Sequence, residues 1–402
     1  MLWAGPREPR QRFDDGDHWQ PLKLNLPATS VRDLWIHEAD LVAGTHGRGF
    51  WILDDITPLR QMVSVSFKPP AYLFVPDRAT RVRWDKWTDT PLPPDEPAGK
   101  NPPDGAIIDY WLSSQATGPV TLEILDSKGE LVRRYSSDDP PEQPDTSANI
   151  PMYWVRPAQR LSAEAGPHRF VWDLRYAPPP ASNRGYPIAA VYRDTPLEPR
   201  GVWVMPGTYH LKLTVGGESF TQPLTVRMDP RVTTPVAALQ QQFAVAMRIV
   251  DTWRKDSTAM AEVRAMRAQV ATLKQAATGS RADSLTAFDG RLAALLSGGA
   301  GGARGRGVAG GPPAGGAQPP AAGAAAAPPP AAQATPAAAP QSNLTRLNGE
   351  LGGLYGIVGG YDGAPTTQAL RAVAAAERTL ADLLARWEAL KREGVGLGVQ
   401  GR

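Results

Sequence analysis

Residues 208–250 read TYHLKLTVGGESFTQPLTVRMDPRVTTPVAALQQQFAVAMRIV, and this stretch contains the change that decides the fold. Residues 208–213 alternate polar and apolar side chains, which is the period of a half-buried strand, and Gly216-Gly217 is a hairpin turn signal. After Pro235, which suits the first turn of a helix, apolar residues recur three and four positions apart. Such an abrupt change from strands to helices predicts separate β and α domains instead of one α/β sheet.

The composition excludes several classes of protein and site. The chain has 402 residues, with 43 Lys and Arg against 40 Asp and Glu, so its net charge is only +3. A nucleic-acid-binding protein usually carries a larger basic excess, so this class is disfavoured. The absence of cysteine excludes disulfides, thiolate nucleophiles and cysteine-ligated metal centres. No stretch approaches 18 apolar residues, so we expect no membrane-spanning helix, and residues 1–6 lack the pattern of an export signal.

Short strands separated by turn groups are predicted in the first part of the chain. Residues 1–60 have the rhythm of partial β-propeller blades, and residues 61–105 read as an irregular connector rich in Pro and Trp. The strands of residues 106–230 are those expected of an immunoglobulin-like β-sandwich. The predicted strands are 2–4, 11–13, 18–22, 31–36, 41–45, 50–53, 71–75, 106–112, 120–125, 130–135, 168–174, 202–205, 208–215 and 220–227.

Amphipathic helices are predicted after residue 230. Two helices are expected in residues 231–297 and two more in residues 341–402, and their apolar stripes predict a bundle or a long hairpin. Between them, 37 of the 43 residues from 298 to 340 are Ala, Gly or Pro. Such a segment has too little apolar surface to bury to offset its chain entropy, so we predict a disordered linker.

The sharpest local motif is DDGDHW at residues 14–19. It resembles the Asp-box, or BNR repeat, of β-propellers. Asp14 can accept backbone hydrogen bonds, Gly16 can adopt a positive φ, and Trp19 can pack between blades. We interpret the motif as a structural staple of a hairpin and not as a set of catalytic acids.

A longer resemblance begins at residues 40–60, DLVAGTHGRGFWILDDITPLR. It continues through residues 88–94, 101–110, 170–175, 206–209 and 347–351. Together these motifs resemble the C-terminal part of bacterial sortilin-like (VPS10-like) WD40/YVTN/BNR-repeat propeller proteins, which are commonly labelled glycosyl hydrolases. The resemblance implies one or two large propellers, then an immunoglobulin-like domain and helices, in a secreted or periplasmic protein.

Glycoside hydrolysis requires two facing carboxyl groups roughly 5–10 Å apart. Asp54 and Asp55 are adjacent, so on a strand they would point to opposite faces. The acids of the Asp-box belong to a turn, and Asp138-Asp139 lies in a Pro-rich segment. We therefore predict no catalytic residue in this chain. If the full-length protein is an enzyme, it is expected to be a glycoside hydrolase whose active site lies in the missing propeller.

A few residues are candidates for contact with a ligand. His46 and Arg48 lie in a Gly-flanked turn, although a polar hairpin turn is the more common explanation of such residues. Trp84 and Trp87 are candidates to stack on sugar rings, or else to pack the connector onto a neighbouring domain. The five histidines lack the spacing of metal ligands, so no metal is expected, and no motif indicates a cofactor.

The predicted function is that of an accessory region supporting a propeller that acts on or binds polysaccharide. The alternatives are a non-catalytic sortilin-like scaffold that binds peptide or polysaccharide, and a truncated gene product. The expected partners are the missing N-terminal propeller and a polysaccharide or peptide, with no nucleic acid and no membrane span. Because a few blades cannot close a propeller, residues 1–60 alone are expected to aggregate, dimerise or remain poorly ordered.

Overall fold

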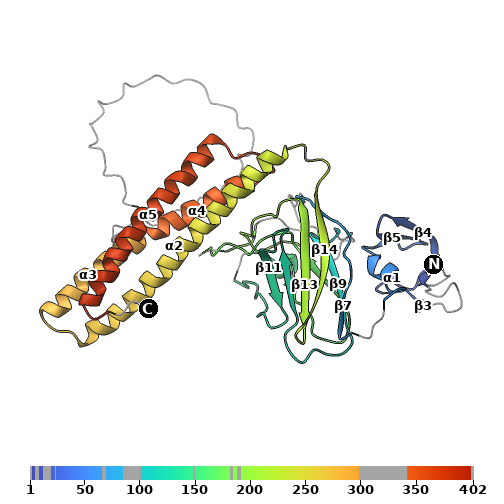
Figure 1. The fold of residues 1–402 in the computed structure, drawn as a ribbon, viewed down its shortest axis with the longest axis horizontal. Helices are drawn as coiled ribbons and strands as arrows, with labels where there is room; N and C mark the ends of the chain where they lie inside the picture. The colour runs from blue at the N-terminus through green and yellow to red at the C-terminus, as the bar shows by residue number, and fades with distance from the viewer. Residues whose placement is uncertain are drawn as a thin grey trace, which may run out of the picture. The chain divides into compact units, whose positions relative to one another are not determined.

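A computed structural model of the chain has β-sheets first and long α-helices after them, as predicted (Figure 1). The chain forms two compact units, one made of Met1–Trp253 and Gly352–Val373 and the other of Arg254–Leu351 and Ala374–Arg402. The segment predicted to be a disordered linker, residues 298–340, lies outside the described residues. The structure describes residues 2–4, 9–11, 20–22, 24–65, 69–84, 99, 101–147, 150–181, 184–187, 192–297 and 342–399.

The first sixty residues form two small antiparallel sheets. One has the order β1-β2-β3 and the other has the order β4-β5-β6. Gly47 and Gly49 have positive φ and turn β5 into β6, a conformation that most other residues adopt only with strain. The elements are β1 (Leu2–Ala4), β2 (Pro9–Gln11), β3 (Gln20–Pro21), β4 (Val31–His37), β5 (Asp40–Thr45), β6 (Phe50–Leu53) and the short helix α1 (Thr57–Gln61).

The central β-domain contains two further sheets. A five-stranded sheet has the order β11-β10-β13-β14-β8, in which only the β14–β8 pair is parallel, and a three-stranded antiparallel sheet has the order β12-β9-β7. The strands are β7 (Ala71–Leu73), β8 (Ala79–Arg81), β9 (Ala106–Leu112), β10 (Thr121–Leu125), β11 (Leu131–Ser136), β12 (Gly166–Trp172), β13 (Gly207–Val215) and β14 (Glu218–Met228).

Both sheets of the central β-domain share one hydrophobic core. Ile108 and Phe170 of the three-stranded sheet belong to the same fully buried cluster as Leu122 and Leu211 of the five-stranded sheet. The alternating sequence of β13 places every second residue in this core, because successive side chains of a strand point to opposite faces. Each such side chain contributes about 1.5–3 kcal/mol when it is removed from water.

The predicted strand at residues 202–205 is wrong. Only Trp203 makes a bridge there, with Arg175, and the Arg175 guanidinium lies 3.8 Å from the centre of the Trp203 ring. Val204 N–H donates to the Leu174 carbonyl and Tyr176 N–H to the Val202 carbonyl, both at 2.9 Å, so this run pairs with residues 174–176 at a single bridge and does not extend into a strand. Three elements were not predicted, because three to five residues are too few to show a period: α1, β8 and the 3-10 helix η1 (Met152–Trp154).

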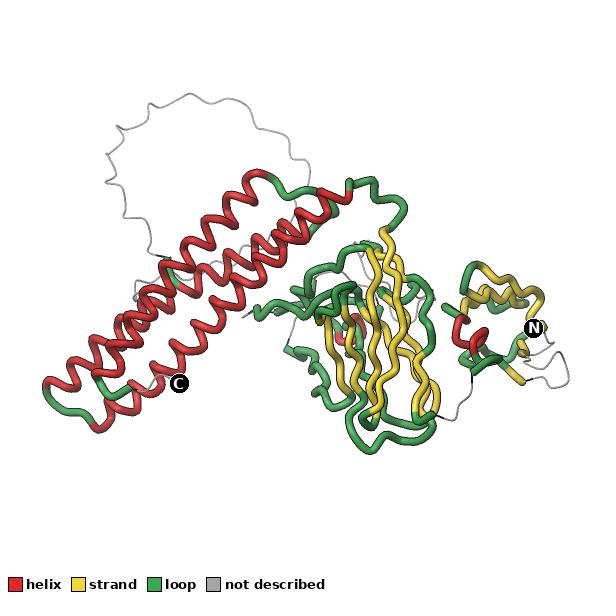
Figure 2. Tube along the Cα trace, viewed as in Figure 1, coloured by secondary structure: helices red, strands yellow, loops and turns green. Residues whose placement is uncertain are grey.

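Four helices follow the sheets (Figure 2). Their bounds are Val236–Ala276 (α2), Ser280–Ser297 (α3), Leu344–Gly359 (α4) and Thr367–Gly396 (α5). Gly279, with φ 58°, separates α2 from α3. Asn343 Oδ1 accepts the N–H of Arg346 at 2.9 Å and Thr366 Oγ1 accepts that of Ala369 at 3.2 Å, so polar side chains cap the starts of α4 and α5.

Within the first unit, parts of α2 and α4 contact the central β-domain. The Tyr355 hydroxyl donates a hydrogen bond to the Arg200 carbonyl at 2.8 Å, and the rings of Phe243 and Tyr176 lie 5.8 Å apart. Gln242, which is buried in α2, donates to the Val358 carbonyl at 2.7 Å. Aromatic packing and buried hydrogen bonds thus position the helix ends on the β-domain.

Candidate functional site

Asp14, Gly16 and Trp19 of the Asp-box, together with Trp87, lie outside the described residues. Trp84 is described and half-buried.

His46 and Arg48 are exposed in the hairpin between β5 and β6. The backbone of both residues holds the hairpin: His46 N–H donates to the Ser30 carbonyl at 2.9 Å, and Trp51 Nε1 donates to the Arg48 carbonyl at 2.9 Å. Within the described ranges, neither side chain forms a hydrogen bond or ion pair, and no such bond joins them to Trp84. The structure therefore does not bring the predicted contact residues together through polar bonds.

The surface that stands out is one face of the β4–β6 sheet. Trp35 pairs with Val42, which pairs with Ile52, so these three side chains form one row across the strands. In the next row on this face, Phe50 lies beside Gly44, with its ring 3.7 Å from the position that a Cβ would occupy there. Trp35 is 68% exposed, Phe50 83% and Ile52 60%. We call Trp35, Val42, Phe50 and Ile52 the outer face.

The opposite face of the same sheet is apolar and covered. Leu41 packs with Leu22 and Ile56, and Ala43 packs with Leu26 and Val31. A sheet with water on one side normally alternates apolar and polar residues, whereas strands that are covered on both faces are apolar throughout. Around Trp35, Val42 and Ile52 the β4–β6 sheet is apolar on both faces although one face is exposed, and the polar residue of that face is Asp33, in the row of Gly44 and Phe50.

The sequence carries a signal for the outer face, which was not predicted. Residues 34–36 read Leu-Trp-Ile and residues 50–53 read Phe-Trp-Ile-Leu, without polar interruption. Continuous apolar runs of this length in a strand indicate that both faces are to be buried.

Arg169 of β12 joins the β4–β6 segment to the central β-domain. Its guanidinium donates to the carbonyls of Asp54, at 2.6 Å, and Asp55, at 2.8 Å. The same group forms two hydrogen bonds, of 2.9 and 3.0 Å, with the carboxylate of Asp109. Burial raises the pKa of Asp109, while the bonds to Arg169 oppose this rise. One guanidinium thus satisfies a buried acid and two backbone acceptors.

The acids near Arg169 mainly form structural hydrogen bonds. Asp40 Oδ1 accepts the N–H of Asp55, and Asp55 Oδ1 accepts the N–H of Thr57, both at 2.9 Å. The pKa of Asp54 is raised by burial and by the carboxylate of Asp40. A raised carboxyl pKa is common in active sites. Glycosidic cleavage needs a second free carboxyl group, and here Asp40, Asp55 and Asp109 are all engaged in hydrogen bonds.

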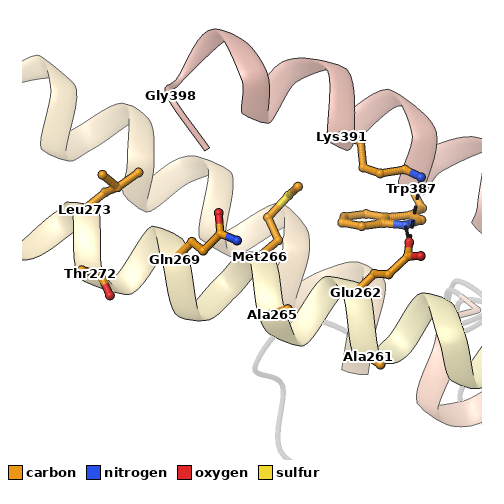
Figure 3. Close-up of a pocket in the computed structure, with 10 residues that line it drawn as sticks. All are labelled: Ala261, Glu262, Ala265, Met266, Gln269, Thr272, Leu273, Trp387, Lys391 and Gly398. Atoms are coloured by element: carbon orange, nitrogen blue, oxygen red, sulfur yellow. Dashed lines mark hydrogen bonds and ion pairs between the residues drawn. The ribbon is translucent and has the colours of Figure 1, made fainter. Parts of the chain in front are cut away.

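A cavity of about 780 Å³ lies in the second unit between α2 and α5 (Figure 3). Trp387 Nε1 donates to Glu262 Oε2 at 2.7 Å at its edge, and Lys391 Nζ lies 3.9 Å from the same oxygen. The rest of the lining is mainly apolar or small, including Ala265, Met266 and Leu273. The Glu262 carboxylate at the edge of the cavity is thus engaged by both Trp387 and Lys391.

No group of three or more potential metal-ligating side chains occurs in the described part of the chain. Among the same residues, no helix combines the length and apolar character needed to cross a membrane. Comparison of this chain with protein-family models, with curated proteins and with solved structures finds no match.

Proposed function

We propose that this chain is an accessory, non-catalytic region of a β-propeller protein of the glycosyl-hydrolase-like type. In this proposal the β4–β6 sheet is part of one blade, and its outer face packs against a neighbouring blade. The observation that carries the proposal is the exposure of Trp35, Phe50 and Ile52 on a sheet whose other face is already covered.

The physical reason is the cost of leaving this face in water. Phe50 and Ile52 of β6 share this face with Trp35 of β4, and Val42 of β5 lies between Trp35 and Ile52, whereas scattered single residues would need no explanation. Burial of each would contribute about 1.5–3 kcal/mol. Blades of a propeller stack face to face, so a neighbouring blade offers an apolar surface of matching shape.

The other parts of the chain have a supporting role in this proposal. The central β-domain is proposed to be an immunoglobulin-like sandwich, and Arg169 ties the blade to it through the carbonyls of Asp54 and Asp55. Since Asp40, Asp55 and Asp109 near this junction are hydrogen-bonded, catalysis, where it occurs, is assigned to blades outside this chain. The alternative of a sortilin-like scaffold uses the same surfaces and differs in having no turnover.

A single-cysteine experiment tests the blade proposal, because the chain has no native cysteine. Phe50→Cys places the only thiol on the outer face, and Glu218→Cys, at an exposed position of β14, is the matched control. We expect rapid maleimide labelling of both variants in the chain alone. In the proposal, further blades precede this chain. In a longer protein that contains those blades, the thiol at position 50 should be protected from maleimide, whereas the thiol at position 218 should stay reactive.

The proposal would be contradicted if position 50 were labelled equally in the chain alone and in the longer protein, or if no blade sequence preceded the chain. Hydrolysis assays on glucan oligosaccharides then separate the enzyme from the scaffold in the longer protein. The chain alone should show no turnover, and glycosidase activity that is lost on substitution of one of its acids would overturn the assignment.

A further inference from the structure

A second exposed aromatic surface lies on two loop segments of the central β-domain. Tyr153 and Tyr192 are both exposed, with their ring centroids 6.4 Å apart and their planes inclined at 37°. Arg193, also exposed, places its guanidinium 5.7 Å from the centre of the Tyr192 ring. We call Tyr153, Tyr192 and Arg193 the tyrosine platform. It shares no residue with the outer face of β4–β6.

The backbone beneath the platform is fixed. Arg193 N–H donates to the Tyr153 carbonyl and Thr195 N–H to the Trp154 carbonyl, both at 2.9 Å. Thr195 is fully buried, and the Trp154 ring stands perpendicular to that of Tyr153 at 6.2 Å. The two segments therefore support each other, so little backbone ordering is needed when the platform binds a ligand.

Ion pairs anchor both segments to the β-domain. Arg156 lies 2.9 Å from the carboxylate of Asp104 and 2.6 Å from that of Asp194. The acid next to Arg193 in the chain is thus already paired with another cation. Arg193 itself forms no ion pair with any residue that the structure describes. The platform therefore combines two exposed tyrosine rings with one positive charge that has no acidic partner among the described residues.

We propose that the tyrosine platform binds an acidic oligosaccharide, with a sugar ring stacked on the tyrosines and a uronic acid carboxylate on Arg193. Tyrosine rings present flat apolar faces that match the C–H face of a sugar, and their hydroxyls remain available to sugar hydroxyls. The Arg193 guanidinium, which lies over the Tyr192 ring, forms charge-assisted hydrogen bonds with the carboxylate of the sugar.

The backbone of the platform argues against an extended peptide as the ligand. Strand addition needs free N–H and C=O groups, whereas the N–H groups of Arg193, Thr195 and Arg156 all donate to the facing segment. Proline-rich peptides use aromatic grooves but have no need of an adjacent cation. The pairing of stacking faces with an unpaired arginine favours an anionic sugar.

Calorimetric titration of the full chain tests this inference. The probes are trigalacturonate, a neutral trisaccharide of the same length, polyglutamate and a polyproline peptide. We expect trigalacturonate to bind most tightly. Tyr153→Ala and Tyr192→Ala should each weaken binding about tenfold. Arg193→Gln should remove the preference for the acidic over the neutral sugar, while the neutral sugar binds as before.

The matched control is Arg134→Gln, which removes an exposed arginine of β11 and should leave binding unchanged. Thermal melts of each variant show whether the fold is intact, and Arg193→Gln, which changes only an exposed head group, keeps the test valid if a tyrosine variant fails to fold. Lack of trigalacturonate binding, equal affinity in the Arg193 variant, or tighter binding of either peptide would overturn the inference. Because the outer face is not involved, this result is independent of the blade proposal.

Discussion

The carboxylate of Asp362 lies 2.8 Å from Nε of Arg83 and also accepts a hydrogen bond from Arg81. Asp362 belongs to the loop between α4 and α5, whereas Arg81 ends β8, so this contact fastens the loop to the central β-domain. Arg81 and Asp362 are both buried. Burial lowers the pKa of Arg81 and the Asp362 carboxylate raises it, so the buried guanidinium depends on this partner.

Removal of the Asp362 carboxylate should be strongly destabilising. Asp362→Ala leaves the buried Arg81 charge without its acid, which typically costs about 3–5 kcal/mol. Urea unfolding followed by tryptophan fluorescence measures the change in the free energy of unfolding. The control is Glu350→Gln, which breaks the half-exposed 3.0 Å pair with Arg346 and should cost less than about 1 kcal/mol. Similar effects of the two changes would show that the buried junction is unimportant.

Asp256 should make the stability depend on pH. It is fully buried in α2, Asn348 Nδ2 donates to its Oδ2 at 2.8 Å, and Oδ1 has no hydrogen-bond partner. Burial raises the pKa of Asp256 to about 6, against 3.8 as the ordinary value, while the Asn348 bond opposes the rise. The folded state thus binds the Asp256 proton more tightly than the unfolded state does. The stabilisation that this proton provides is complete below pH 4 and is lost as the pH rises through 6. The loss should be on the order of 3 kcal/mol.

Asp256→Asn removes this titration and keeps an acceptor for Asn348. Urea unfolding between pH 4 and pH 8 should show a much flatter pH profile for this variant than for the unmodified chain. Asp382→Asn, at an exposed position of α5, should keep the original profile. An unchanged profile in the Asp256 variant would mean that another group controls the pH dependence.

Arg169 should control the attachment of the β4–β6 segment. Arg169→Gln removes the charge partner of buried Asp109 and weakens the bonds to the Asp54 and Asp55 carbonyls, so we expect a loss of about 2–4 kcal/mol. Limited trypsin digestion should cleave after exposed Arg60 faster in the variant. Arg134→Gln is the control for the loss of one arginine. An unchanged cleavage rate would show that the segment is held by other contacts.

Polar substitution of the outer face should change association more than stability. Trp35→Ser, Phe50→Ser and Ile52→Thr together remove large apolar groups that are already in water, so the free energy of unfolding should change by no more than about 1.5 kcal/mol. Binding of a hydrophobic dye and self-association, measured by light scattering, should both fall. A much larger loss in the free energy of unfolding would instead show that these side chains are part of the chain's own core.

The order of elements was predictable because it depends on local pattern. The alternation in residues 208–213 and the 3.6-residue period after Pro235 identified β13 and the start of α2. Strand β6 was predicted with its observed bounds, since Gly47 and Gly49 mark the turn before it. The strand expected at residues 202–205 was wrong because its backbone pairing stops at one bridge, and the extent of that pairing depends on residues 174–176, far along the chain.

The outer face and the tyrosine platform were harder to predict from the sequence. The apolar runs at residues 34–36 and 50–53 indicate a sheet that is apolar on both faces, but they do not say which face is covered. The tyrosine platform joins Tyr153 to Tyr192 through non-local backbone pairing, for which no local pattern exists.

By itself, the sequence determined the change from β to α structure, the glycine turns, the absence of cysteine chemistry and the positions of the helices, because period, turn residues and composition act over a few residues. Only the tertiary structure decided that Arg169 would bind Asp109, that Asp362 would meet Arg81 and Arg83, and that the outer face would remain exposed. These outcomes depend on which distant groups approach closely enough to exclude water, and that is a property of the packed chain.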